Sequence, residues 1–226
     1  WDDFRFFSKL KKIYTMRIIK IGLPVATLNA LFAFVNMFLG RTASTVGGHL
    51  GLMAMTTSGQ IEAITWNTSQ GFSTALSAFV AQNYAAKKIE RVMKALKSTL
   101  LMTLIFGTIC SLLFIFCGNQ IFAIFVPERE AYEAGGLALR IDGYSQLFMM
   151  LEITLQGVFY GMGRTVPPAI ISIGCNYLRI PMALLFVSLG WGLPGIWWTI
   201  CLTSILQGII IIVWFMVIKK KTLDKI

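Results

Sequence analysis

Charged side chains and the residues of common catalytic sites are scarce in this 226-residue chain. Only 13% of its residues are charged, and it has one histidine and four cysteines. The cysteines are Cys110, Cys117, Cys175 and Cys201. All four lie in apolar runs without metal-binding or redox spacing, which favours small buried residues over ligands or disulfides. No nucleophile, metal or cofactor pattern emerges either, so we expect neither an enzyme nor a bound cofactor.

Apolar residues dominate instead, since 56% of the chain is hydrophobic and the mean hydropathy is +0.72. These values lie outside the range of soluble domains, so an integral membrane protein with the lipid bilayer as partner is predicted. A window of about 19 residues marks six spans long enough to cross a bilayer. They are residues 18–39, 53–86, 98–117, 138–160, 167–189 and 195–218. Because only helices or closed barrels satisfy the backbone in lipid, and no alternating strands are present, the predicted fold is all-α and polytopic.

The net charge of +10 arises from short basic clusters at the ends of the spans. A nucleic-acid partner is not expected, because the basic residues are not spread over one face or tail. Sixteen of the twenty Lys and Arg residues fall on one side of the six spans. The positive-inside rule then predicts cytoplasmic termini in the plasma (inner) membrane. Residues 1–17 are predicted as a cytoplasmic amphipathic linker helix, 18–218 as the transmembrane unit and 219–226 as a basic cytoplasmic tail.

Polar residues of the second span form two stripes on a helical wheel. One stripe contains Ser58, Glu62, Thr65, Ser69 and Ser73, and the other contains Gln60, Asn67 and Thr74. Neither face of such a helix can lie in lipid, so it must pack between helices or border a water-filled cavity. The hydroxyl groups alone suit interhelical hydrogen bonds. Glu62 favours an ion or substrate path, because a mid-span acid costs about 2.5–3.5 kcal/mol on insertion scales.

Three other spans carry polar stripes. In the fourth span the stripe contains Asp142, Ser145, Gln146, Glu152, Gln156 and Tyr160; in the first it contains Asn29 and Asn36; in the fifth it contains Ser172, Asn176 and Arg179. A structural ion pair of Arg179 with Glu152 or Glu62 is expected in preference to a direct substrate role. The acids suit cation handling, since carboxylates in a partly dry cavity bind protons more readily and Trp66 and Tyr160 can add cation–π contacts.

Three sequence segments resemble the second half of the multidrug and toxic compound extrusion (MATE) transporters. They are SQGFSTALSAFVAQNYAAKKIERV at residues 69–92, LQGVFYGMGRT at 155–165 and NYLRIP at 176–181. The resemblance covers nearly the whole chain, from IGLP at residue 21 to the last span. It implies one six-helix lobe of a twelve-helix, two-lobe fold, with a separate N-terminal lobe as partner. It also implies export of small organic cations by antiport with protons or sodium ions.

The residues and the resemblance together give a set of candidate substrate and coupling-ion residues. They are Glu62, Glu152, Asn29, Asn36, Trp66, Gln146, Gln156 and Tyr160. Two alternatives stay open. A flippase for lipid-linked sugars would need a basic cavity for phosphate groups, which Arg179 favours and the acids oppose. A membrane assembly subunit without transport activity would need no mid-span acids.

Overall fold

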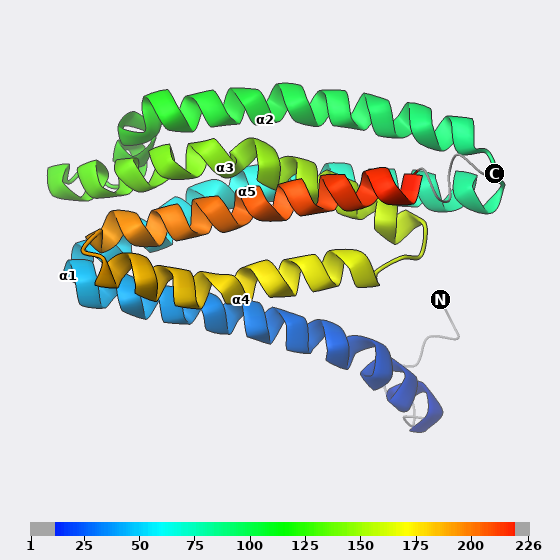
Figure 1. Ribbon diagram of the computed structural model, residues 1–226, viewed down its shortest axis with the longest axis horizontal. Coiled ribbons are helices and arrows are strands. Elements are labelled where there is room, and N and C mark those ends of the chain that lie inside the picture. Colours follow the sequence, from blue (N-terminus) through cyan, green and yellow to red (C-terminus); the bar gives the residue numbers. More distant parts are fainter. Residues whose placement is uncertain (1–11, 220–226) are drawn as a thin grey trace, which may run out of the picture.

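A computed structural model of the chain describes residues 12–219, with side chains described for Met16 and residues 30–219. Every element in this range is a helix (Figure 1). The helices are α1 (Lys12–Ala85), α2 (Ile89–Phe125), α3 (Arg129–Gly161), α4 (Val166–Ser188) and α5 (Gly192–Ile218). The predicted all-α fold is confirmed. Most of the predicted linker helix and basic tail lies outside the described residues, and both remain predictions.

The long helix α1 is two helices joined at Gly48. This residue has φ 59° and ψ −145°, a backbone conformation that side chains with a Cβ atom rarely adopt. The chain doubles back at this point, which brings Gly51 so close to Ala43 that a Cβ atom on Gly51 would lie 2.4 Å from the Ala43 carbonyl oxygen. Residues 12–47 and 49–85 are called here the first and second halves of α1. With α2 to α5 they give six helical rods, in agreement with the six predicted spans.

The helices extend well beyond the predicted apolar spans. Both α2 and α3 begin nine residues before the predicted boundary, and helix fills most of the expected connections 40–52 and 118–137. Residues 126–128 alone form the short non-helical link between α2 and α3. The difference arises because hydropathy marks the part of a helix that matches the lipid core, whereas helical hydrogen bonding continues into polar residues at both ends.

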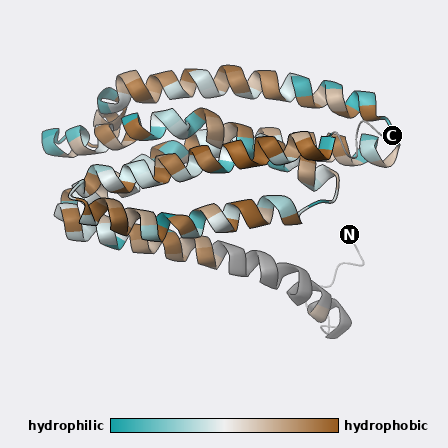
Figure 2. Cartoon of the chain, in the orientation of Figure 1, coloured by the Kyte–Doolittle hydropathy of each residue, from teal (hydrophilic) through white to brown (hydrophobic). Residues whose placement is uncertain are grey.

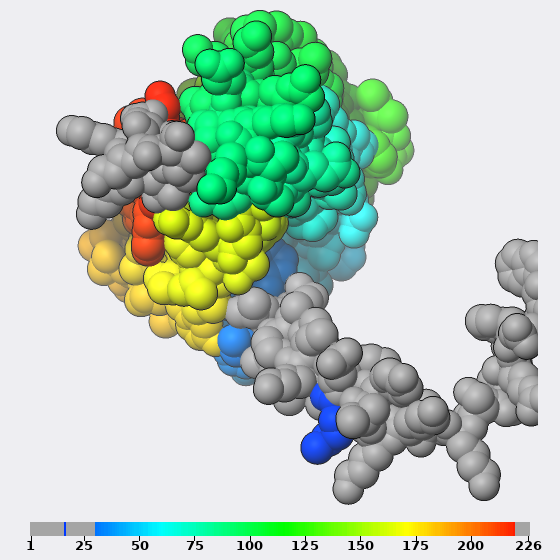
Figure 3. Space-filling view, turned by 90° about the vertical axis from the view of Figure 1, so that its right-hand side faces the viewer, coloured from blue at the N-terminus to red at the C-terminus, as the bar shows by residue number. Residues whose placement is uncertain are grey.

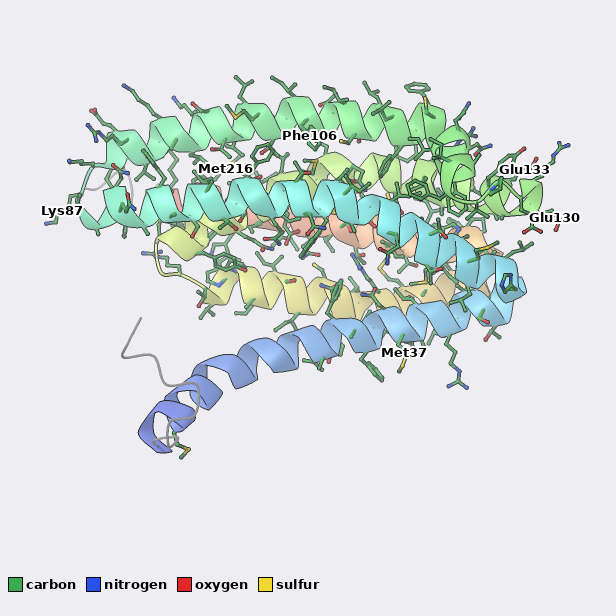
Figure 4. The ribbon with its side chains drawn as sticks, turned by 180° about the vertical axis from the view of Figure 1, so that it is seen from behind. Met37, Lys87, Phe106, Glu130, Glu133 and Met216 are labelled. Atoms are coloured by element: carbon green, nitrogen blue, oxygen red, sulfur yellow. The ribbon has the colours of Figure 1, made fainter. Side chains whose placement is uncertain are left out.

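The helices form an up-and-down bundle around α3, which contacts each of the other four. The α1–α2 and α3–α4 junctions lie at the same end of the bundle as the beginning of α1 (Figure 1). Viewed from that end, α2 and the first half of α1 lie on opposite sides of the molecule (Figure 3). Lys87 marks this end, and Glu130 and Glu133 mark the opposite one (Figure 4).

Three of the described helices, α2, α4 and α5, are long and apolar enough to cross a membrane on length and composition. Much of their length is coloured as hydrophobic in Figure 2, and hydrophilic residues gather at several helix ends. The two helices outside this group, α1 and α3, carry the polar stripes found in the sequence. They are packed tightly together, since a Cβ atom at Gly157 of α3 would lie 2.4 Å from the Ser73 carbonyl oxygen of α1. This contact aligns the two polar stripes side by side.

Candidate functional site

A cavity of about 1170 Å³ lies between both halves of α1 and helices α3, α4 and α5. No residue of α2 lines it. The lining combines apolar side chains with acids, amides and two arginines, Arg41 and Arg179. The size and mixed lining are typical of a pocket for a drug-sized molecule.

Most of the predicted site residues meet in this cavity. Those that line it are Asn36, Glu62, Trp66, Glu152, Gln156, Tyr160 and Arg179. Gln146 lies behind the lining, fully buried, where its Oε1 atom accepts a hydrogen bond from Thr65 Oγ1 at 2.9 Å. The side chain of Asn29 lies outside the described part of the chain. Trp66 and Tyr160 are 46% and 44% exposed, so both present ring surface to the cavity.

Glu152 on α3 is held by amide donors from two helices. Gln207 on α5 donates from Nε2 to Glu152 Oε1 at 2.8 Å, and Gln156 donates to the same oxygen from one turn further along α3. The Tyr160 hydroxyl donates in turn to Gln156 Oε1 at 3.3 Å. Glu152 is 94% buried, since only 6% of it is exposed. These hydrogen bonds hold the carboxylate at the cavity wall and satisfy part of its hydrogen-bonding capacity.

Glu62 on α1 and Asp142 on α3 form a second group of acids. The two carboxylates interact electrostatically with each other and with Arg179 on α4. Asp142 is only 6% exposed, and its Oδ1 atom has no hydrogen-bond partner. The Gln146 amide interacts with Glu62, but its Nε2 atom makes no hydrogen bond of good geometry. Unsatisfied buried polar atoms are uncommon in folded proteins, which makes this region a candidate binding site.

The predicted partner of Arg179 needs correction. Its Nε and one terminal nitrogen donate to Thr203 Oγ1 and Ser204 Oγ on α5, each at 3.0 Å. Among the described residues Arg179 makes no close ion pair with Glu152 or Glu62. Both acids act on it at longer range. Two hydroxyl groups therefore satisfy the guanidinium directly, and the carboxylates only offset its charge.

Four residues of the site were not among the predicted ones. Asp142 belongs to the predicted polar stripe of α3, but it was not assigned a role. Thr203, Ser204 and Gln207 lie on α5, which reads as an apolar span. A signal was present nonetheless, because Thr199, Thr203 and Gln207 follow one another at four-residue spacing on a single helical face.

The two polar stripes of the second half of α1 have different surroundings. Ser58, Thr65, Ser69 and Ser73 are buried against the bundle. On the other stripe Gln60 lines the cavity, whereas Asn67 and Thr74 are exposed. Asn67 donates only to the Ala63 carbonyl of its own helix, at 2.7 Å. Among the described residues the second stripe is thus not packed against a neighbouring helix; it borders the cavity at Gln60, and the surroundings of Asn67 and Thr74 remain a prediction.

Comparisons with known proteins place this geometry in context. The sequence profile of the MatE family matches residues 24–185. "Probable multidrug resistance protein NorM" of Thermotoga maritima is 26% identical over 188 residues, which are 80% of this chain and 39% of that protein. "Multidrug and toxin extrusion protein 1" of Homo sapiens is 28% identical over 174 residues, 76% of this chain and 30% of that protein.

A solved structure shares the fold. It is the inward-facing conformation of a multidrug resistance MATE family transporter of the MOP superfamily, with a TM-score of 0.85 at 19% identity. The match covers 97% of this chain and 50% of that one. The chain therefore spans half the length of the solved transporter and less than half the length of the two curated relatives.

Proposed function

The chain belongs to the MatE family of multidrug transporters, and we propose that it forms the second lobe of a secondary active exporter of organic cations, driven by protons or sodium ions. The observation that carries this proposal is the charge of the cavity. In the described part of the chain three acids line it, Glu62, Asp142 and Glu152. The two arginines of the lining, Arg41 and Arg179, offset only part of that charge. A cavity with surplus negative charge at membrane depth attracts cations.

Carboxylates can couple the export of a cation to the entry of another. Moving one positive charge outward against 100 mV costs about 2.3 kcal/mol, and one proton moving inward offsets the same amount. A one-for-one exchange is then driven by the proton gradient alone. Glu62 is our candidate for the exchanging group, because it is partly exposed and lines the cavity beside a second acid.

The aromatic walls suit the organic part of such a substrate. Trp66 on α1 and Tyr160 on α3 both expose ring surface to the cavity. Cations within about 6 Å of a ring face gain roughly 0.5–2 kcal/mol from the ring quadrupole. Phe32 and Tyr177 add further exposed aromatic surface to the lining. Recognition by shape-tolerant aromatic contacts is compatible with several substrates.

A second lobe would complete the cavity. Asn67 and Thr74 expose polar groups on α1 at a depth where lipid would leave them unsatisfied. The solved transporter is twice as long as the region that this chain matches. We place the N-terminal lobe of the transporter against this face. The cytoplasmic orientation of Lys87 and of both termini follows from the positive-inside rule and belongs to the same proposal.

The flippase alternative depended on Arg179 as a phosphate ligand. Its guanidinium donates to two hydroxyl groups and is surrounded by three acids. A phosphate group approaching it would meet more negative than positive charge. The site geometry therefore favours a cationic substrate over a lipid-linked sugar.

Replacing Glu62 tests the proposal. In inverted vesicles that contain the native full-length protein, Glu62→Gln is expected to reduce uptake of an organic cation driven by a pH gradient at least tenfold. Glu90→Gln is the matched control, because Glu90 is exposed at the start of α2 and does not line the cavity. Size-exclusion profiles of both variants check folding. Uptake at the wild-type rate in Glu62→Gln would refute a transport role for this residue. Glu62 would then have only a structural role in packing.

A further inference from the structure

We propose that the cavity preferentially binds elongated dications, with one positive charge at each of two separate acidic centres. This inference rests on the proposed function and specifies its substrate class. The first acidic centre consists of Glu62 and Asp142, and the second consists of Glu152. An apolar spacer would join the two charges of the ligand.

The two centres lie far apart along the bundle. Asp142 and Glu152 are ten residues apart on α3, which corresponds to about 15 Å along the helix axis. Glu62 lies near the level of Asp142, because Thr65, one turn after Glu62, donates to Gln146, one turn after Asp142. The electrostatic interactions agree: Glu62 acts on Asp142, whereas the charge acting on Glu152 is that of Arg179.

Arg179 separates the centres. It interacts with all three acids, and it is hydrogen-bonded to Ser204, one turn before the Gln207 that holds Glu152. Three carboxylates and the guanidinium groups of Arg41 and Arg179 leave a surplus of one negative charge in the lining, and Arg179 is the arginine whose charge acts on all three acids. A single cation placed midway would face the guanidinium, so positive charges are favoured at the two ends. Methylene groups between them can lie along the apolar part of the lining, which includes Met149, between Asp142 and Glu152 on α3.

One orphaned oxygen atom indicates the chemistry of the first centre. Asp142 Oδ1 has no hydrogen-bond partner, although the residue is only 6% exposed and lines the cavity. Because a carboxylate oxygen is an acceptor, the missing group is an N–H or O–H donor. A protonated amine satisfies this acceptor and the negative charge together, whereas a quaternary ammonium group satisfies only the charge.

The second centre has different requirements. Glu152 already accepts hydrogen bonds from Gln207 and Gln156. Tyr160 exposes its ring in the same part of the lining. This environment accommodates a protonated amine or a methylated ammonium group, since attraction here depends on charge and ring contact more than on a donated hydrogen bond.

The experiment compares linear diamines with monoamines of equal length. Binding to the purified native full-length protein in nanodiscs is measured by calorimetry for the series from diaminobutane to diaminododecane. Affinity should rise at least tenfold between diaminobutane and the members whose extended length matches the separation of the centres, diaminodecane and diaminododecane. The monoamine series corrects for the added methylene groups. Full methylation of both nitrogens should lower the affinity of the long diamines, because the first centre then loses its donor.

Two variants sharpen the test. Asp142→Asn should lower the affinity for diaminodecane to that for decylamine, whereas Glu90→Gln should leave the diamine preference unchanged. The inference is overturned if long diamines bind no more tightly than monoamines of the same length. That result leaves the proposed function intact when a monovalent organic cation is still taken up under a pH gradient. Absence of any coupled cation uptake would instead contradict the proposed function itself.

Discussion

Helices α2 and α3 pack against each other but have opposite surroundings. In α3, 19 of 33 residues are buried, including Asp142, Gln146 and Glu152. In α2 only 8 of 37 are buried, and its exposed residues include Leu101, Ile105 and Phe116. The more polar helix is thus the more buried one. This order reverses that of a soluble bundle, because lipid accepts apolar side chains on the outside and polar groups need partners within the protein.

The comparison explains which helices are identified as membrane spans by their mean hydropathy. Helix α2 is identified in this way and α3 is not, although both run the length of the bundle. A helix that lines a polar cavity is shielded from lipid by its neighbours, so its sequence need not be continuously apolar. Weak hydropathy in a helix of membrane length is therefore a signal for a site.

The largest expected effect comes from one pair of phenylalanines. Phe159 on α3 is fully buried and packs edge-on against Phe215 of α5, with ring centroids 6.2 Å apart. Phe159→Ala should lower the unfolding free energy by about 3 kcal/mol, because it leaves a cavity that neighbouring side chains cannot fill. Phe116→Ala on α2 should change it by less than about 0.5 kcal/mol, since Phe116 is 70% exposed.

Both variants can be compared by thermal or denaturant unfolding in detergent or bicelles. Equal losses in the two variants would contradict the assignment of α2 to the outer layer. A small loss for Phe159→Ala would show that the interior around α3 is loosely packed.

A smaller effect is expected at the contact between α3 and α1. Gly157→Ala places a methyl group 2.4 Å from the Ser73 carbonyl oxygen, so the helices must separate. We expect a loss of about 2 kcal/mol, the usual range for overpacking. Gly174→Ala on α4 is the matched control, because nothing lies within 4 Å of its added methyl group. The control should be neutral or slightly stabilising, as Ala favours helix over Gly. Similar melting curves for the two variants would argue against close packing here.

The smallest effect concerns Arg179 and its hydroxyl partners. A double-mutant cycle between Thr203→Val and Arg179→Gln should give a coupling of about 0.6 kcal/mol, the average for hydrogen bonds between membrane helices. Thr199→Val is the control, because its hydroxyl donates to the Gly195 carbonyl of the same helix. If Arg179 coupled more strongly to Glu62 than to Thr203, a direct ion pair would replace the observed arrangement.

The fold class could be predicted from composition because a bilayer allows few alternatives. Six spans were recognisable for the same reason. The helix ends were not, since polar residues such as those after Val126 or before Ala138 carry no hydropathy signal for helix. The sequence analysis also did not predict that the first two spans are joined at Gly48 almost without a loop. A reversal at a single residue needs no run of loop-forming residues that the sequence could show.

The site was predicted in part. Glu62, Glu152 and Tyr160 were found because helical spacing places polar groups on one face. The partners of Arg179 were not, because spacing along one helix says nothing about which helix packs opposite. The positive charge of Arg179 suggested an acid as its partner. The hydroxyl groups of Thr203 and Ser204, which lie closer, were overlooked because they belong to an apolar span. Pairings between helices depend on packing, which one sequence does not reveal.

The reversal at Gly48 also bears on how the chain enters the membrane. With no loop between them, the two halves of α1 form a helical hairpin that offers no flexible segment for a tag or a protease. The polar second half, which would insert poorly alone, emerges from the ribosome directly behind the first half and can enter lipid paired with it. Biogenesis of the polar wall of the cavity is thereby tied to one glycine, whereas the short link at residues 126–128 is the better place for an inserted epitope.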